Sequence, residues 1–377
     1  MSCFKYMILF ICCASDINAY FEFKQINNHN FVPANPNYRI KLPKDHGFHK
    51  NKAYEWWYTV GQLFSDEKHE NKSGSFQVVV FRISRPYQEF SKRNHQPSIF
   101  VVNLVYSDLI EKQHYHTSYH VNPLLHPDEL TSESFRLILP GIRLKISSDG
   151  TLNLNYEATF PSGKYISLKG TLSARKAVVF HGDNGYSRKG SCSTCASHYL
   201  SYTRLQGIVK ANKDGREETF YALSWHDHEF GSQTLSSDQI GWNWFGIQLN
   251  SKEEFMLFSM RNRDENQTPF QSGTHILASG EVVNIPGKDI KMEPIALSES
   301  GKGIFYPTTW RIKLSGRLER SFMVKANNPH QISNSHLKNF PNYWEGSSDV
   351  LASDGKTLLG HAFLEMTGYD PDAIPKF

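Results

Sequence analysis

The feature that most constrains this 377-residue chain is a series of short runs rich in β-branched and aromatic residues. Residues 75–84 and 98–106 are two such runs, each bounded by turn-forming residues, and residues 152–160 alternate between apolar and polar side chains. These patterns are typical of β-strands. Similar runs recur at 220–225, 242–249, 254–260, 310–314, 321–325 and 360–366. Because amphipathic helical periodicity is not found, the sequence predicts an all-β fold of the barrel or sandwich type.

A weak internal repeat indicates how these strands are divided. Residues 55–63 align with residues 241–249, so that Trp56 matches Trp242 and Gln62 matches Gln248. The strand-like run that follows each segment corresponds as well. A chain of this length is expected to form about two domains. We therefore expect two similar β units that pack closely, at residues 20–210 and 211–377.

The first residues of the chain have the pattern of a secretory signal peptide. Lys5 precedes a short apolar run that ends at Ala14, and the small residue Ala19 follows at the place of a cleavage site. The run is too short to span a bilayer as a helix. We expect residues 1–19 to be removed and the protein to be exported, to the periplasm or the extracellular space, without a transmembrane segment. A buried N-terminal segment is the alternative.

Removal of the signal peptide would leave two of the five cysteines, Cys192 and Cys195, in the sequence Cys-Ser-Thr-Cys. In an oxidising compartment, a small loop disulfide is the default interpretation of such a pair. The glycine-containing residues 182–190 favour an irregular loop at this place. Two alternatives are free or redox-active thiols and a metal site completed by nearby histidine or aspartate side chains. We expect a disulfide and no metal.

The charge balance bears on the class of partner. The chain has 41 Lys and Arg against 37 Asp and Glu, a net charge of +4, and no run of basic residues concentrates it. We therefore expect no nucleic-acid partner. The sequence also has no nucleophile elbow, phosphate-binding loop, dinucleotide fingerprint or zinc-protease motif. Serine-hydrolase and nucleotide-dependent functions therefore have no support.

The most concentrated set of reactive side chains lies in residues 224–232, Ser-Trp-His-Asp-His-Glu-Phe-Gly-Ser. On a strand, Trp225, Asp227 and Glu229 share one face, and the two histidines share the other. Two carboxylates beside an indole can form an acid–base pair, because apolar surroundings raise the pKa of a carboxyl group. Two alternatives remain: the carboxylates anchor loops by hydrogen bonds, or the two histidines bind a metal with a third ligand.

A second cluster is Glu55-Trp-Trp-Tyr58, in which Glu55 and Trp57 would face one side of a strand. The simplest interpretation is a core filled with aromatic rings. However, a glutamate among three aromatic residues cannot be buried cheaply without a partner. Glu55 therefore either pairs with a basic residue or lines a cavity. Glu345 poses the same question, because it lies in Tyr343-Trp-Glu-Gly346.

Together these motifs resemble the lipocalin-like carotenoid 1,2-hydratase (hydroxyneurosporene synthase) and AttH-like family. The matching motifs follow one another in the expected order between residues 43 and 369. They are Pro43-x-Asp-x-Gly47, Glu55-Trp-Trp-Tyr58, His181-Gly-x-x-Gly-Tyr-Ser187, Trp225-x-Asp-His-Glu-x-Gly-Ser232, Gly241-Trp-x-Trp-Phe245, Ser272-Gly-Thr274, Tyr306-Pro-x-x-Trp310, Tyr343-Trp-Glu-Gly346 and Leu364-Glu-x-Thr-Gly-Tyr369.

The resemblance implies two lipocalin-like antiparallel β-barrel domains packed together. It also implies a hydrophobic small molecule, isoprenoid or lipid-like, held in or between the barrels. The hydratase members add water across an isoprenoid carbon–carbon double bond without a cofactor, so no cofactor is expected. Similar fungal proteins catalyse cycloadditions, so the fold does not determine one reaction. A carrier protein that binds a hydrophobic ligand without catalysis is the alternative function.

The resemblance further implies roles for particular residues. His198 and Asp227 occupy the places of an acid–base pair in the hydratase pattern, although Leu200 and Trp225 differ from the residues of that pattern. A neutral carboxylic acid would protonate the alkene, and aromatic faces would stabilise the carbocation. The expected catalytic residues are Asp227 as the general acid, His198 or Glu229 to position water, and Trp225 beside them. The expected ligand-binding residues are Glu55, Trp57, Trp242, Trp244 and Tyr186.

Overall fold

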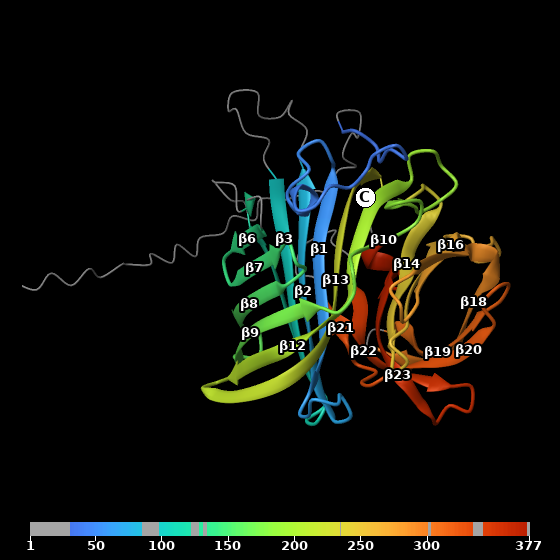
Figure 1. Ribbon diagram of the computed structural model, residues 1–377. Helices are drawn as coiled ribbons and strands as arrows, with labels where there is room; N and C mark the ends of the chain where they lie inside the picture. The colour runs from blue at the N-terminus through green and yellow to red at the C-terminus, as the bar shows by residue number, and fades with distance from the viewer. Residues whose placement is uncertain are drawn as a thin grey trace, which may run out of the picture.

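A computed structural model describes residues 31–84, 98–121, 128–130, 134–233, 235–300, 303–334 and 342–374. The expected signal peptide lies outside these residues. Within them the chain is all-β, as the sequence predicted, and forms two curled antiparallel sheets that lie side by side (Figure 1). The described part also contains the short 3-10 helices η2 (Lys44–His46), η4 (Gly287–Asp289) and η5 (Pro371–Ala373). None of its helices has the length and apolar character needed to cross a membrane.

The first sheet contains 13 described strands. They are β1 (Tyr54–Phe64), β2 (Lys72–Ser84), β3 (Ser98–Asp108), β4 (Gln113–Val121), β5 (Asp128–Leu130), β6 (Ser134–Leu139), β7 (Ile142–Ser147), β8 (Leu152–Thr159), β9 (Tyr165–Ala174), β10 (Val179–Phe180), β11 (Tyr186–Arg188), β12 (Ala196–Lys213) and β13 (Arg216–Gln233). The main order is β4-β3-β2-β1-β13-β12-β9-β8-β7-β6-β5, and β10 and β11 pair with β12. The last strand of this sheet therefore returns to its centre, between β1 and β12.

The second sheet contains 10 described strands. They are β14 (Gln239–Leu249), β15 (Glu254–Asn262), β16 (Gln271–Ile276), β17 (Val282–Pro286), β18 (Ile290–Glu299), β19 (Phe305–Leu314), β20 (Arg320–Ala326), β21 (Ile332–Ser333), β22 (Tyr343–Ala352) and β23 (Leu358–Thr367). The main order is β17-β16-β15-β14-β23-β22-β20-β19-β18, and β21 pairs with β22. The two sheets divide between β13 and β14, whereas the boundary expected at 210/211 falls inside β12. That boundary was placed too early, because β13 completes the centre of the first sheet.

The two segments of the internal repeat occupy equivalent places in the two sheets. β1 lies between β2 and β13, and β14 lies between β15 and β23. The matched glutamines make reciprocal contacts: Gln62 Nε2 donates to the Ala362 carbonyl in the second sheet at 3.0 Å, and Gln248 Nε2 donates to the Thr203 carbonyl in the first at 2.8 Å. Each of the matched glutamines therefore joins its own sheet to the other one.

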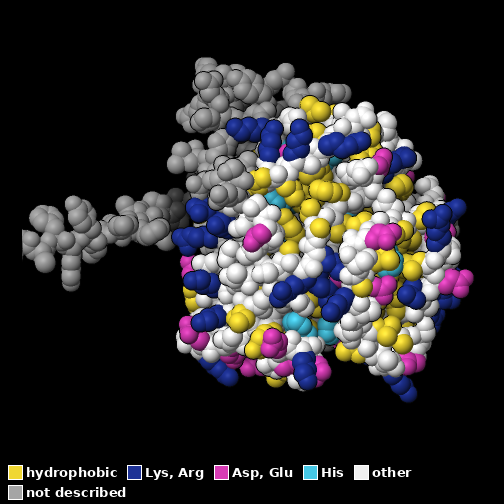
Figure 2. Space-filling model, viewed as in Figure 1, with side chains coloured by type: hydrophobic (Ala, Val, Ile, Leu, Met, Phe, Trp, Pro, Cys, Tyr) yellow, Lys and Arg dark blue, Asp and Glu magenta, His cyan; other side chains and the backbone are white. Residues whose placement is uncertain are grey.

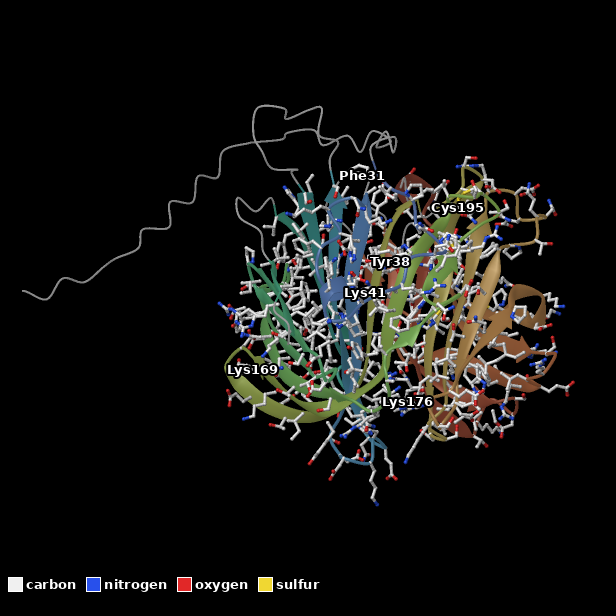
Figure 3. All side chains as sticks on the ribbon, turned by 45° about the horizontal axis from the view of Figure 1, so that its top comes forward. Phe31, Tyr38, Lys41, Lys169, Lys176 and Cys195 are labelled. Atoms are coloured by element: carbon white, nitrogen blue, oxygen red, sulfur yellow. A yellow bond between two sulfur atoms is a disulfide. The ribbon has the colours of Figure 1, made fainter. Side chains whose placement is uncertain are left out.

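Strand alternation sorts the side chains into three regions. Trp57 belongs to a buried cluster enclosed by the first sheet, and Trp344 belongs to one enclosed by the second. Tyr58 and Trp244 belong to a further cluster that joins the two sheets. The outer face seen in Figure 2 intersperses Lys and Arg with Asp and Glu. Figure 3 shows the side chains between the sheets, where Lys176 is labelled. The region between the sheets is thus a core of its own.

Candidate active site between the two sheets

A cavity of about 120 Å³ lies between the central strands of the two sheets, and we call it the chamber. Its lining is mostly apolar and rich in rings. The aromatic residues of the lining are Trp56, Tyr58, Phe81, Tyr199, Trp242, Trp244, Phe258 and Tyr343. One buried water needs about 10 to 15 Å³ of such space, so the chamber has room for about ten waters or a small organic ligand of that size.

Four carboxyl groups face this aromatic chamber: Asp227, Glu229, Glu345 and Glu365. Asp227 and Glu229 lie on the same face of β13, as strand alternation predicts. Glu345 of β22 lies directly opposite Glu365 of β23 in the strand register. Lys189 is the one cation among the described lining residues. The chamber therefore brings together more acids than bases.

Asp227 is held by neutral hydrogen-bond donors. Tyr199 Oη donates to its Oδ2 at 2.7 Å, Trp225 Nε1 donates to Oδ1 at 2.6 Å, and the Ser201 hydroxyl also donates to Oδ1. Burial raises the pKa of Asp227 to about 7, although these hydrogen bonds favour the ionised form. The side chain therefore exchanges a proton close to neutral pH, as a general acid must.

The two glutamates of the second sheet are also shifted towards the neutral form. Burial raises the pKa of Glu345 well above its ordinary value, and the charge of Glu365 raises it further. Tyr58 Oη and Gln77 Nε2 donate to the Glu345 carboxyl group, the amide at 2.7 Å. Burial raises the pKa of Glu365 to about 7, and the carboxylates of β13 add to that rise. Because like charges this close are not all ionised, the chamber holds neutral carboxylic acids near pH 7.

Glu229 differs from the other three acids because it has a cationic partner. Lys189 Nζ lies 2.8 Å from Glu229 Oε1, and the Ser197 hydroxyl donates to the same oxygen. The Lys189 ammonium also lies 4.7 Å from the ring centroid of Tyr199 and 4.5 Å from that of Phe258. Both contacts are within the range of cation–π attraction.

The loop after β11 carries Lys189 into the chamber. The backbone N–H of Lys189 donates to the Cys195 carbonyl at 2.8 Å. Cys192 and Cys195, expected to be joined, form a disulfide in this loop, with Cα atoms 5.2 Å apart. The disulfide is therefore next to the segment that positions the only lining cation of the described chain.

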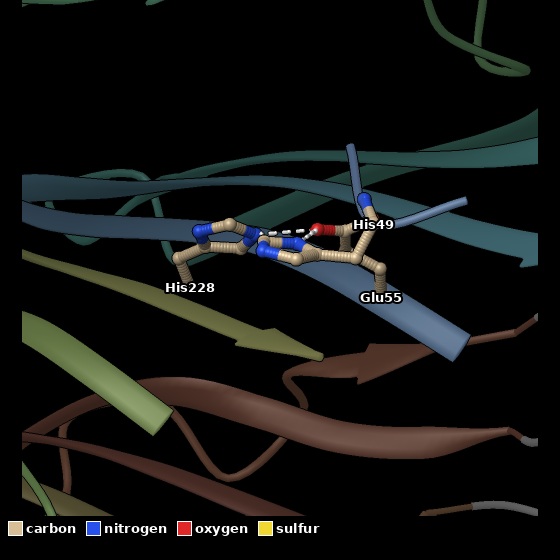
Figure 4. Close-up of side chains that lie close together, drawn as sticks. All are labelled: His49, Glu55 and His228. Atoms are coloured by element: carbon tan, nitrogen blue, oxygen red, sulfur yellow. Dashed lines mark hydrogen bonds and ion pairs between the residues drawn. The ribbon is translucent and has the colours of Figure 1, made fainter. Parts of the chain in front are cut away.

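Glu55 and Trp57, expected to bind the ligand, lie on the other face of β1 and do not line the chamber. Glu55 is fully buried. Its Oε2 pairs with Arg82 at 3.0 Å. Its Oε1 accepts hydrogen bonds from His49 Nδ1 at 2.6 Å and from His228 Nε2 at 2.9 Å, as Figure 4 shows. Burial raises the pKa of Glu55, but His49 and Arg82 outweigh it and hold the pKa below its ordinary value. Glu55 is therefore the buried partner of a basic residue.

His49, Glu55 and His228 place potential metal-ligand atoms within 4.8 Å of one another. The two histidine nitrogens, however, meet the same carboxylate oxygen, and Arg82 holds the other oxygen. The guanidinium would repel a metal ion at this place. His226, paired with His228 in the metal alternative, instead bonds the Thr59 hydroxyl at 2.8 Å. We interpret the group as a hydrogen-bonded ion-pair network that joins β1 to β13.

His198 and Tyr186 also lie outside the chamber. His198 is paired in register with Phe230, and it faces the opposite side of the sheet from Asp227. Its Nε2 accepts a hydrogen bond from the backbone N–H of Asn35 at 3.3 Å. Tyr186 of β11 is its neighbour in the register. The structure therefore does not bring His198 to Asp227 as an acid–base partner.

The structure thus separates the expected site residues into two groups. Asp227, Glu229, Trp242 and Trp244 line the chamber, and Trp225 supports Asp227. Sequence reasoning asked whether Glu345 pairs with a basic residue or lines a cavity, and the structure places it in the lining. It did not select the other lining residues Glu365, Lys189, Trp56, Tyr58 and Tyr199. The internal repeat points to two of them. Trp56 is aligned with Trp242, which the sequence analysis did select. Glu365 lies opposite Trp244 in the second sheet, just as Asp227 lies opposite Tyr58 in the first. Lys189 gave no such signal, because its loop has no counterpart in the repeat.

Comparison with known proteins finds relatives over the whole described fold. A family model described as AttH-like matches residues 33–369. An AttH protein from Nitrosomonas europaea is similar with a TM-score of 0.77 and 24% identity, covering 90% of this chain and 100% of that one. Kievitone hydratase from Nectria haematococca is similar with a TM-score of 0.62 and 14% identity, covering 92% of this chain and 98% of that one. CghA with Sch210972 is similar with a TM-score of 0.52 and 11% identity, covering 84% of this chain and 88% of that one. Comparison with curated protein sequences finds no match. The structural likenesses establish the fold.

Proposed function

This chain belongs to the AttH-like family, and from that premise we propose that it is a cofactor-independent hydratase for a largely apolar substrate. The observation that carries the proposal is the set of buried carboxyl groups with raised pKa inside an aromatic chamber. A hydratase, kievitone hydratase, has the same fold. We also propose that the enzyme acts after export, which the pattern of residues 1–19 favours.

In the first step, Asp227 acts as the general acid. Its proton is transferred to one carbon of the double bond, so that the π electron pair forms a C–H bond and the other carbon becomes cationic. A carboxyl group with a pKa of about 7 is matched to this task near neutral pH. The faces of Tyr58 and Trp244 supply negative quadrupole density for the developing cation.

In the second step, water attacks the cationic carbon and Glu365 accepts the proton that water loses. The new C–O bond takes its electron pair from the water oxygen, and the product is an alcohol. Glu345, hydrogen-bonded to Tyr58 and Gln77, would hold the water in place. Asp227 and Glu365 have similar pKa values, so proton exchange through solvent resets both groups after turnover.

The proposal is tested by incubating the purified protein with unsaturated isoprenoids in ¹⁸O-labelled water. We expect one labelled oxygen per product molecule. The rate in Asp227→Asn should fall by at least about 100-fold, the usual effect of losing a general acid. Asp214→Asn, the same change at an exposed residue, is the matched control. Label incorporation that persists unchanged in Asp227→Asn would contradict the assigned acid. If no label appears and ligands extracted from the protein are chemically unaltered, a carrier function replaces the hydratase proposal.

A further inference from the structure

The chamber contains more acidic groups than its own cation can neutralise. Lys189 pairs with Glu229. In the described part of the chain, no ion pair joins a cation to Asp227, Glu345 or Glu365, and the hydrogen bonds that Asp227 and Glu345 accept come from neutral groups. An apolar substrate alone would supply neither a charge nor a hydrogen-bond donor to these three acids. The excess points to a cation that arrives with the ligand.

Two unpartnered acceptors in the lining point in the same direction. Gln77 Oε1 and Asn103 Oδ1 belong to side chains that are 1% and 2% exposed, and neither oxygen has a hydrogen-bond partner among the described residues. The Gln77 amide is oriented because its Nε2 donates to Glu345 at 2.7 Å. A buried acceptor without a donor is costly, so these oxygens call for a ligand that donates hydrogen bonds. This observation is independent of the carboxyl groups.

The walls of the chamber already accommodate one cation. The Lys189 ammonium lies over the rings of Tyr199 and Phe258, at 4.7 and 4.5 Å from their centroids. Trp56, Trp242 and Trp244 line the remaining space. Indole faces are the strongest aromatic partners of organic cations. The lining can therefore bind an ammonium group and an apolar body together.

We propose that the substrate of the chamber is an apolar organic cation, with a protonated amine that donates hydrogen bonds. The ammonium group would lie beside Glu345 and its register partner Glu365, with N–H groups directed at Gln77 and Asn103, so that Asp227 keeps the proton that the first step needs. This inference rests on the proposed function only in taking the chamber as the substrate site. Binding would ionise one neutral acid: its O–H bond breaks, the electron pair stays on the carboxylate beside the ammonium, and the proton leaves to solvent.

The affinity for such a ligand should depend on pH through the groups that face it. These are Asp227 and Glu229 of β13, Glu345 and Tyr343 of β22, Glu365 of β23, Tyr58 of β1, Tyr199 of β12 and Lys189 of the loop after β11. Protonation of the carboxyl groups removes the charge that the ammonium would meet. The preference for a cation should therefore weaken as the pH falls from 8 to 5.

Isothermal titration calorimetry of the full chain with 2-phenylethylamine and 2-phenylethanol tests the inference. The two probes share size and a hydrogen-bond donor, and differ in charge. At pH 8 we expect the amine to bind about tenfold tighter than the alcohol. Repeating the titration in buffers of different ionisation enthalpy should reveal net proton release for the amine alone. Equal binding of the two probes, tighter binding of the alcohol, or binding of neither would overturn the proposal.

Variants locate the effect in the chamber. Glu345→Gln and Glu365→Gln keep the shape of the side chain, and each should weaken the binding of the amine about tenfold. The affinity for the alcohol should stay the same, which also shows that the chamber is folded. Glu157→Gln, at an exposed glutamate, is the matched control. An amine preference that survives in the double variant would place the binding elsewhere and overturn the proposal. Binding is measured without turnover, so this result and the ¹⁸O result can fail independently.

Discussion

At the scale of single residues, Glu55 and Asp227 show how one chemical group serves two purposes. Both carboxyl groups are buried, and they lie on the neighbouring strands β1 and β13. Glu55 meets the charged Arg82 and two histidines, so burial leaves it ionised. Asp227 meets only neutral donors, so burial favours its protonated form. The first is part of what holds the strands together, and the second is available for chemistry.

Replacing Glu55 tests the structural role. Glu55→Gln would leave the buried Arg82 guanidinium without a counter-charge, and breaking a buried pair in this way costs about 3–5 kcal/mol. Urea unfolding should show this loss in the free energy of unfolding. The exposed Glu157→Gln should change it by less than about 0.5 kcal/mol. A change at Glu55 as small as that of the control would show that the ion pair does not stabilise the fold.

The raised pKa of Glu365 predicts that Glu365→Gln, unlike Glu55→Gln, stabilises the fold, by an amount that depends on pH. A carboxyl group whose pKa is higher in the folded state contributes stability below its unfolded pKa, and this contribution is lost as the pH rises through about 7. Glu365→Gln removes the penalty of ionisation. The variant should therefore gain stability relative to the parent chain between about pH 4.5 and 8, on the order of 2 to 3 kcal/mol in total.

Urea unfolding of both proteins at pH 5 and pH 8 measures this gain. The difference between the two free energies of unfolding should be near zero or unfavourable at pH 5 and favourable at pH 8. A difference that does not change with pH would mean that Glu365 ionises as it does in the unfolded chain.

At the scale of strands, alternation predicts which residues share a face but not which face meets the site. The pairing of Asp227 with Glu229 follows from period two and holds in β13. For β1 the same rule separates Trp56 and Tyr58 from Glu55 and Trp57, and the expectation chose the face that packs inside the first sheet. The packing of β1 against β14, seen in the contact of the Tyr58 and Trp244 rings, decides which face meets the site. This contact joins residues far apart in the sequence. The all-β class, in contrast, follows from local composition.

The loop after β11 carries a prediction about the disulfide. Closing a loop of four residues restricts the unfolded chain by about 2 kcal/mol in the chain-entropy model. The variant Cys192→Ser, Cys195→Ser should lose about that much stability, and the parent chain should lose the same amount when a reductant is added. The doubly substituted chain should not respond to the reductant. Thermal unfolding with and without reductant measures both, and an unchanged midpoint in the variant would contradict the prediction.

At the scale of the whole molecule, polar contacts around the chamber hold the two sheets together. Gln62 and Gln248, which do not line it, each donate a hydrogen bond to a backbone carbonyl of the other sheet. Away from it, Lys72 of the first sheet pairs with Asp349 of the second at 2.6 Å. Because each sheet contributes part of the chamber, the site exists only when the sheets are docked. Catalytic residues and interface residues are therefore expected to depend on one another.

Glu254 gives the sharpest test of this dependence, because it joins the second sheet to two cations of the first. Lys176 Nζ lies 2.6 Å from its Oε2, and Arg204 Nε donates to its Oε1. Burial raises the pKa of Glu254 above its ordinary value, against the opposing effect of both cations. Removing the carboxylate leaves two cations close together in a buried interface. We expect Glu254→Gln to cost about 3–5 kcal/mol.

The loss of stability in Glu254→Gln should appear in two measurements on the same protein. Urea unfolding followed by tryptophan fluorescence and by far-ultraviolet circular dichroism should shift together, because the sheets are expected to unfold as one cooperative unit. The effect should persist in about 1 M salt, since buried charges are weakly screened. A fluorescence transition that precedes the circular dichroism transition would instead show that the sheets separate before either unfolds. In that case Glu254 would control access to the chamber without determining the stability of the sheets.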